Sequence, residues 1–272
     1  MQVNRMQITS TGPIRHRLSV RALLLVLSLG LLIGCAGTPE PVQVDTSITA
    51  EEIYERAWRR MTAGNYDGAM QMLRALEARH PFTPEGQQAQ LDQIYVTHLA
   101  GDRRGTAEVA RRYIRENPRS DHLDYAYYMQ GIAWFDMRSS LSRRILNLDH
   151  ARLDVTNAHR SFDAFRELVE RFPDSEYSQD ARLRMIYLRN VIARHNWHVA
   201  NHYLERGAYM AAAARASKVI EEMQPNEVTP FAMDILAAAY DGVGESSMAA
   251  DVRSLRGRSF PNHQEGGEPP IR

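Results

Sequence analysis

Three histidines with helical spacing could bind a metal ion. His195, His198 and His202 are three and four residues apart, so a helix would place their imidazole rings on one face. Imidazole nitrogens are common ligands of zinc and copper. Trp197 and Tyr203 between them are typical of a packing helix, so the pattern favours a packing or surface role and we predict no metal. The motifs His-Glu-x-x-His, Gly-x-x-x-x-Gly-Lys and Gly-x-Ser-x-Gly are missing, and we predict no catalytic residue.

The single cysteine, Cys35, has a sequence context that predicts chemical modification. A leader with four arginines and no acid precedes an apolar run at 22–33, a pattern typical of a secretory signal peptide that begins at Met1 or Met6. Leu-Ile-Gly-Cys at 32–35 is similar to the bacterial lipobox, in which the cysteine becomes the first residue of the mature protein. We therefore expect residues 1–34 to be removed, with an N-acyl chain and an S-diacylglycerol on Cys35.

Composition excludes several classes of protein. The 33 basic and 33 acidic residues leave no net charge, which argues against a nucleic-acid partner. One cysteine allows neither an intramolecular disulfide nor a cysteine-based zinc site.

Ala36 follows the cysteine, at the position where an aspartate would retain enterobacterial lipoproteins in the inner membrane. We expect a chain held by lipid in the outer membrane of a Gram-negative bacterium, facing the periplasm.

A repeated spacing indicates how the rest of the chain folds. Five blocks share a turn residue, a small residue five positions on, two further positions at nine and twelve, and a proline at seventeen or eighteen. The blocks start at Gly64, Gly101, Thr156, Gly207 and Gly244. Glycine suits a left-handed helix cap, the small residue permits close helix packing, and proline ends the second helix. The pattern resembles the tetratricopeptide repeat and predicts an all-α, right-handed superhelix of about five helical hairpins.

The spacing also divides the chain into segments. We expect a tether at 35–48, repeats 1 and 2 at 49–120, repeats 3 and 4 at 121–225, and repeat 5 at 226–261. Extra residues between the second and third blocks predict an inserted loop near 136–155. The first helix of repeat 4 is predicted to be long, from about Gln179 to Arg206. The tail at 262–272 contains Gly-Gly and Pro-Pro, which predicts disorder.

Several segments resemble one family, the BamD (ComL) lipoproteins of the β-barrel assembly machine. His-Pro-Phe-Thr-Pro-Glu-Gly-Gln-Gln at 80–88 is similar to the family's Tyr-Pro-Phe-Gly-Pro segment, and Asp-Tyr-Ala-Tyr-Tyr-Met-Gln-Gly at 124–131 to its Asp-Tyr-x-x-Tyr-Met-x-Gly helix. Residues 162–180 and Glu-Arg-Gly-Ala-Tyr at 205–209 are also similar. The resemblance covers residues 35–261.

The resemblance implies a non-catalytic scaffold. The C-terminal repeats would bind BamA, other Bam lipoproteins could join, and the N-terminal repeats would receive unfolded outer-membrane β-barrel proteins. A tetratricopeptide groove can bind a peptide that ends in an aromatic residue, and aromatic side chains are its expected contacts. Our candidates for peptide binding are Tyr54, Trp58, Phe82, Tyr95 and Tyr128. For partner binding they are Arg206 and Arg215, which flank the matching turn of the fourth repeat.

Two other classes of function remain open on the sequence. Other tetratricopeptide lipoproteins are periplasmic adaptors that position peptidoglycan enzymes, and affinity for those enzymes would distinguish this alternative. The second alternative is an enzyme with an unrecognised site.

Overall fold

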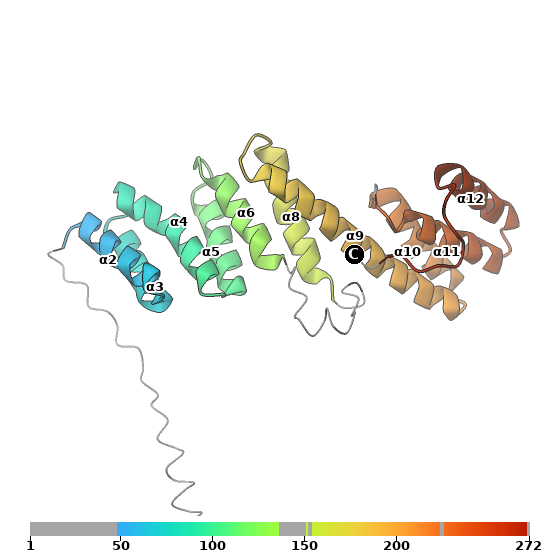
Figure 1. Ribbon diagram of the computed structural model, residues 1–272, viewed down its shortest axis with the longest axis horizontal. Helices are drawn as coiled ribbons and strands as arrows, with labels where there is room; N and C mark the ends of the chain where they lie inside the picture. Colours follow the sequence, from blue (N-terminus) through green and yellow to red (C-terminus); the bar gives the residue numbers. More distant parts are fainter. Residues whose placement is uncertain (1–47, 136–150, 152–153, 224–225, 271–272) are drawn as a thin grey trace, which may run out of the picture. The chain divides into compact units, whose positions relative to one another are not determined.

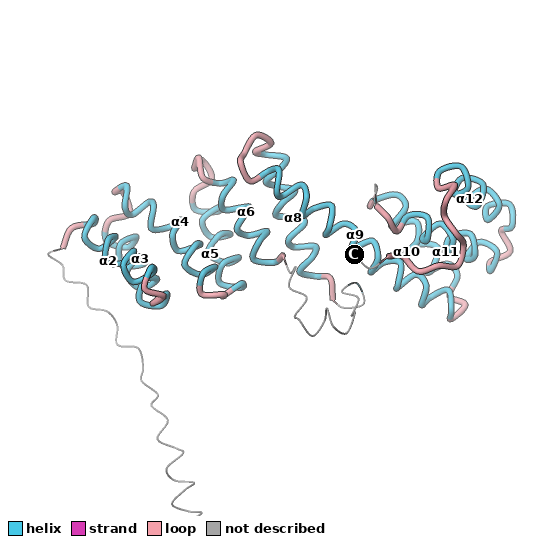
Figure 2. The backbone as a smooth tube through the Cα atoms, in the orientation of Figure 1, coloured by secondary structure: helices cyan, strands magenta, loops and turns pink. Residues whose placement is uncertain are grey.

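The computed structural model describes residues 48–135, 151, 154–223 and 226–270. Cys35, the leader, the tether and most of the predicted insertion lie outside these residues. Every regular element in the described part of the chain is a helix (Figures 1 and 2). No helix in this part is both long enough and apolar enough to cross a membrane.

The helices form five consecutive hairpins, which confirms the predicted all-α fold of tetratricopeptide type. Each helix packs against the next along the chain, and contacts also join α2 to α4, α4 to α6 and α9 to α11. The first helix of repeat 4 is long, as predicted. The pairs are α2 (Ala50–Thr62) with α3 (Tyr66–Arg79), α4 (Pro84–Leu99) with α5 (Arg103–Glu116), α6 (Leu123–Trp134) with α8 (Thr156–Arg171), α9 (Ser178–Glu205) with α10 (Tyr209–Glu222), and α11 (Thr229–Gly242) with α12 (Ser246–Ser259).

The repeated spacing acts as predicted at the ends of the helices. Gly64 and Gly101 have φ angles of 77° and 75°, in the left-handed region that glycine adopts without steric cost. The backbone N–H of Gly64 donates to the carbonyl of Met61 at 3.0 Å, which closes the end of α2. At the other end of the first hairpin, α3 stops at Arg79, two residues before Pro81.

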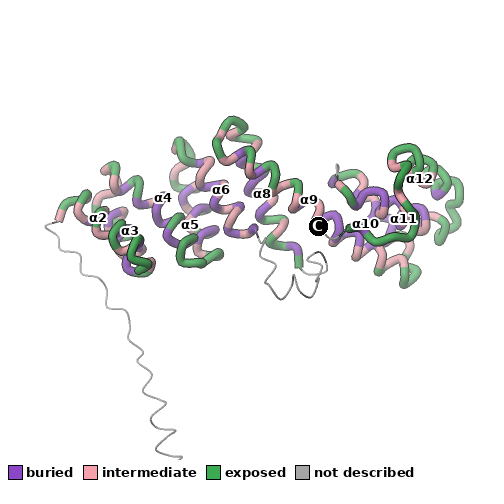
Figure 3. Tube along the Cα trace, in the orientation of Figure 1, coloured by how far each residue is buried: buried purple, intermediate pink, exposed green. Residues whose placement is uncertain are grey.

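Every hairpin contains buried stretches (Figure 3). The small residues of the repeat lie near the start of the second helix of each hairpin. All five are completely buried: Ala69, Thr106, Ser161, Ala212 and Ala249. The hydroxyl of Ser161 donates to the carbonyl of Gly131 at 2.8 Å, so even a polar residue here is satisfied. Gly131 itself allows a close approach, because a Cβ atom there would lie 2.4 Å from the ring of Phe165.

The expected disorder of the tail is wrong for residues 262–270. This segment runs back from α12 across α11 to α9 (Figure 1), where the carbonyl of Pro270 accepts a hydrogen bond from Arg194. The composition of the tail carries no information on its partners, because these lie far away in sequence. Asp234 is 29 residues from His263, and Arg194 is 76 residues from Pro270. The same contacts explain Arg256, which stands at an apolar position of the fifth block and pairs with Asp234 and Glu265.

Candidate peptide-binding surface

Tyrosines from four successive hairpins form a row on or just before their first helices. We call Tyr54, Tyr95, Tyr125, Tyr128 and Tyr177 the tyrosine row. They come from α2, α4, α6 and the residue before α9. The contacts of α2 with α4 and of α4 with α6 bring these helices side by side. None of the five is completely buried, so the row offers aromatic surface to a ligand.

Asp92 links the first two hairpins beneath this row. The Tyr54 hydroxyl donates a hydrogen bond to the Asp92 carboxylate, and the Gln88 side-chain amide donates to it at 2.9 Å. Burial raises the pKa of Asp92, although these two donors act in the opposite direction. Burial and the neighbouring Asp92 also raise the pKa of Tyr54, so its hydroxyl remains a hydrogen-bond donor at neutral pH.

Aromatic stacking continues the row from the third hairpin to the fourth. The rings of Tyr128 and Tyr177 stack with centroids 4.8 Å apart, and Tyr125 lies 5.9 Å from Tyr177. The Tyr128 hydroxyl donates to the Asp180 carboxylate at 2.9 Å. Burial would raise the pKa of Asp180, but hydrogen bonds from Arg184 and Tyr128 outweigh it and lower that pKa. Asp180 is therefore held as an anion at this end of the row.

The structure brings three of the five predicted aromatic residues into the row, namely Tyr54, Tyr95 and Tyr128. Trp58 lies one turn beyond Tyr54 on α2 and is 49% exposed. Phe82 lies in the turn before α4 and is 91% exposed. About three turns of α4 lie between it and Tyr95, so it is outside the row.

Sequence reasoning did not select Tyr125 and Tyr177 as site residues. Tyr125 belongs to the Asp-Tyr-x-x-Tyr segment of α6, and that segment was the signal that could have identified it. Tyr177 precedes a helix and shows no periodicity. Its contact with Tyr128 depends on how the third hairpin packs against the fourth.

The two predicted partner-binding arginines lie on the fourth hairpin. Arg206 caps the C-terminal end of α9 and is exposed. Arg215 is an exposed residue of α10, and its guanidinium donates to the side-chain carbonyl of the buried Asn196 at 3.2 Å. This bond holds one edge of the Arg215 guanidinium toward α9 and fixes its position on the surface.

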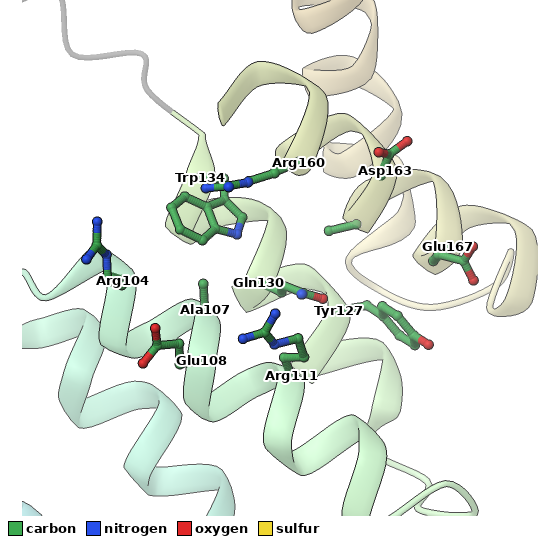
Figure 4. A pocket seen from close by; sticks show the side chains of 11 residues that line it. Arg104, Ala107, Glu108, Arg111, Tyr127, Gln130, Trp134, Arg160, Asp163 and Glu167 are labelled. Atoms are coloured by element: carbon green, nitrogen blue, oxygen red, sulfur yellow. The ribbon is translucent and has the colours of Figure 1, made fainter. Parts of the chain in front are cut away.

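A second concavity, which sequence reasoning missed, lies between α5, α6 and α8 (Figure 4). It measures about 560 Å³, and its wall includes Trp134 with the Arg160 guanidinium 4.9 Å from the ring centroid. Its charges are balanced, because three arginines and three acids contribute to the wall: Arg104, Arg111, Arg160, Glu108, Asp163 and Glu167. A wall of both signs does not select a strongly charged ligand.

The three helical histidines make contacts other than with a metal ion. A ring nitrogen of His195 hydrogen-bonds the carbonyl of Ala151 at 2.7 Å, and Trp197 packs edge-on against His198. Across residues 48–135, 151, 154–223 and 226–270, no group of three His, Cys, Asp or Glu side chains is placed to hold a metal ion.

Comparison with known proteins places these features in a family. Residues 46–255 match the YfiO family, described as outer membrane lipoprotein. The chain is 32% identical to the outer membrane protein assembly factor BamD of Neisseria meningitidis serogroup A over 89% of this chain and 92% of that protein. BamD of Vibrio cholerae is 29% identical over 85% of this chain and 94% of its own, and BamD of Xylella fastidiosa 28% over 88% and 82%.

Proposed function

This chain belongs to the YfiO family of outer membrane lipoproteins, with the BamD assembly factors among its relatives, and from that membership we propose a specific role in outer membrane protein assembly. The chain is a non-catalytic scaffold that binds BamA through its C-terminal repeats and unfolded β-barrel proteins through its N-terminal repeats. Other Bam lipoproteins could bind the same scaffold.

The tyrosine row is the observation that carries the proposed binding of unfolded barrels. Tyr95 is 40% exposed, and its neighbours Tyr54 and Tyr125 are only partly buried. Side chains of this kind can stack on an aromatic residue of a peptide, and each such pair contributes about 0.5–1.5 kcal/mol beyond the area that it buries. The row runs from the first hairpin to the start of the fourth, so an extended peptide can contact several rings at once.

The proposed BamA surface contains Arg206 and Arg215. A guanidinium held in position loses less conformational freedom when it binds a carboxylate or a carbonyl. The bond of Arg215 to Asn196 supplies that restraint. Membrane attachment is assigned to lipid on Cys35, which would hold the scaffold at the periplasmic face of the outer membrane.

Affinity purification tests the scaffold role. The tagged, lipidated chain is isolated in gentle detergent, and its partners are identified by mass spectrometry. We expect BamA in stoichiometric amount. Recovery of peptidoglycan enzymes without BamA would support the adaptor alternative and contradict the proposal. Arg215→Glu should weaken BamA binding by about 2–5 kcal/mol. Arg59→Glu, at an exposed arginine on α2, is the matched control and should leave BamA binding unchanged.

Peptide titration tests the N-terminal role separately. A fluorescent peptide that ends in phenylalanine and alternates apolar with polar residues, like the last strand of a barrel, is titrated with the chain. Tyr95→Ala combined with Trp58→Ala should weaken binding at least tenfold. Leu255→Ala on α12 is the matched control, because Leu255 is 48% exposed and Trp58 is 49% exposed. Equal loss in both variants would remove the tyrosine row and the neighbouring Trp58 from the proposal.

A further inference from the structure

In the last two hairpins, the surface between the first helices α9 and α11 is covered by the chain's own tail. A cavity of about 340 Å³ lies there, between Trp197, Asn201 and Leu204 of α9, residues of α11, and residues 265–268 of the tail. An adjoining cavity of about 530 Å³ is lined by α9 and Glu268. We call this surface the α9–α11 groove. The tail, residues 262–270, crosses it as an irregular segment with a turn at residues 265–266 (Figure 1).

A polar cluster holds the first part of the tail. The His263 ring hydrogen-bonds the Asp234 carboxylate at 2.7 Å and packs edge-on against Phe231 at 4.6 Å. Arg256 pairs with Asp234 and also with Glu265 of the tail, at 3.0 Å for Glu265. The cluster therefore recognises an imidazole and a carboxylate two residues apart.

A buried arginine holds the far end. Arg194 is 4% exposed, and its guanidinium donates to the carbonyl of Pro270 at 2.6 Å. Pro269 is buried beside it. A main-chain carbonyl accepts this bond, and any extended segment carries such a carbonyl. The Arg194 contact therefore does not depend on the side chain of its partner, whereas the buried position of Pro269 does.

The middle of the tail is exposed. This holds for residues 264–268, and Gly266 has a φ angle of 84° that bends the chain there. A segment that buries few apolar groups opens at low free-energy cost. Because the tail is part of the same chain, it competes with a free peptide for the groove at an effective concentration in the millimolar range.

We propose that the α9–α11 groove is a second peptide-binding site, separate from the tyrosine row. It accepts an acidic, proline-containing segment of a partner protein, and residues 262–270 fill it until that segment displaces them. The acidic character follows from Arg256, which pairs with Glu265, and the proline from the buried position of Pro269. The inference goes beyond the proposed function, because it needs neither BamA nor the tyrosine row.

The test uses the full mature chain and a fluorescein-labelled peptide with the sequence of residues 261–270. A tail-release variant carries His263→Ala, Glu265→Ala and Pro269→Ser. We expect the peptide to bind this variant at least tenfold more tightly than the unchanged chain, as measured by anisotropy. A control peptide with the same three substitutions should not bind. Equal binding to both chains, or no binding to the release variant, would overturn the proposal.

Further variants in the release background locate the site. Arg194→Gln should weaken peptide binding at least tenfold, and Arg182→Gln, at an exposed position on α9, should leave it unchanged. Since Arg194 is buried, circular dichroism must show an unchanged fold. Ala238→Trp, which fills the groove wall on α11, is the second variant and should also abolish binding. Retained binding in both variants would contradict the assignment. Light scattering measures the oligomeric state as the last check. A dimer in which two copies exchange tails would make a second copy, and not a partner protein, the occupant of the groove, and would overturn the proposal.

Discussion

The tyrosine row, which runs over hairpins 1–3 to the start of the fourth, and the α9–α11 groove of hairpins 4 and 5 are two surfaces of opposite character. Both are built on the same repeated spacing, with a completely buried small residue in each hairpin. The tyrosine row offers aromatic rings to a ligand, whereas the α9–α11 groove is covered by the chain's own tail. The repeat therefore determines how helices pack, and the positions between the repeat residues determine what each surface binds.

The two surfaces also differ in how they use charge. In the tyrosine row, Asp92 and Asp180 belong to the helices and accept hydrogen bonds from tyrosine hydroxyls. In the α9–α11 groove, α9 supplies Arg194 and α12 supplies Arg256, and the tail supplies the carboxylate of Glu265. A ligand of the row needs aromatic groups, and a ligand of the groove needs acidic groups and a free carbonyl.

Two glycines provide the largest test of this comparison, because one lies in each region. A Cβ at Gly131 would lie 2.4 Å from Phe165, which is completely buried and cannot move aside. A Cβ at Gly242 would lie equally close to Tyr209, which is only partly buried and can turn outward. We expect Gly131→Ala to lower the free energy of unfolding by about 1–3 kcal/mol. Gly242→Ala should cost below about 1 kcal/mol, because helix propensity offsets part of the clash. Urea unfolding measures both, and the reverse order would mean that the C-terminal hairpins are the more tightly packed.

Removal of the tail contact should affect only the C-terminal hairpins. His263→Ala removes a hydrogen bond to Asp234 and a ring contact with Phe231, for an expected cost of about 1 kcal/mol. Hydrogen exchange should become faster in α11 and α12 and stay unchanged in α2 and α4. His98→Ala, at an exposed position of α4, is the control. Faster exchange along the whole chain would show that the two regions are not independent.

The two aspartates of the tyrosine row should respond to pH in opposite directions. Burial raises the pKa of Asp92, so the folded chain holds this proton more tightly and loses stability as pH rises through the carboxyl range. Asp92→Asn removes that loss and should be the more stable chain at pH 7, by less than about 1 kcal/mol. The pKa of Asp180 is lowered despite its burial, so Asp180→Asn should be less stable at pH 7 than its parent. Urea unfolding at pH 4 and pH 7 measures both differences, and equal signs would contradict the assignment.

The smallest expected effect on stability comes from the exposed ring of the row. Tyr95→Ala should change the free energy of unfolding by about 0.5 kcal/mol, because Tyr95 is 40% exposed. The matched substitution Phe231→Ala in the groove should cost more, since Phe231 contacts His263. Thermal unfolding compares the two variants. A large cost for Tyr95→Ala would make it a core residue and not a ligand contact.

The sequence was sufficient for the elements and their order. Gly64, Ala69 and Pro81 predicted where α2 ends, where it packs against α3 and where α3 ends, because each role is local. The same reasoning placed the long helix α9 within one residue at each end.

Contacts between distant residues could not be predicted. Tyr177 reaches Tyr128 only after the third hairpin has packed against the fourth, and Pro270 reaches Arg194 across 76 residues. A repeat pattern gives the spacing within a hairpin. It does not say which residues a segment contacts when that segment folds back over several hairpins. For that reason, the sequence predicted three residues of the tyrosine row and none of the groove.

The order of packing has a mechanical consequence. The main contacts between the described helices join each helix to the next or to the next but one, so tension between the two ends of the described repeats would pass largely through the interfaces in series. The weakest interface in such an arrangement yields first. The last helix, α12, contributes one buried residue, Ala249, and is the natural point of failure. Arg256 pairs with Asp234 of α11 and with Glu265 of the tail. These ion pairs stabilise the interface at which α12 would otherwise separate first.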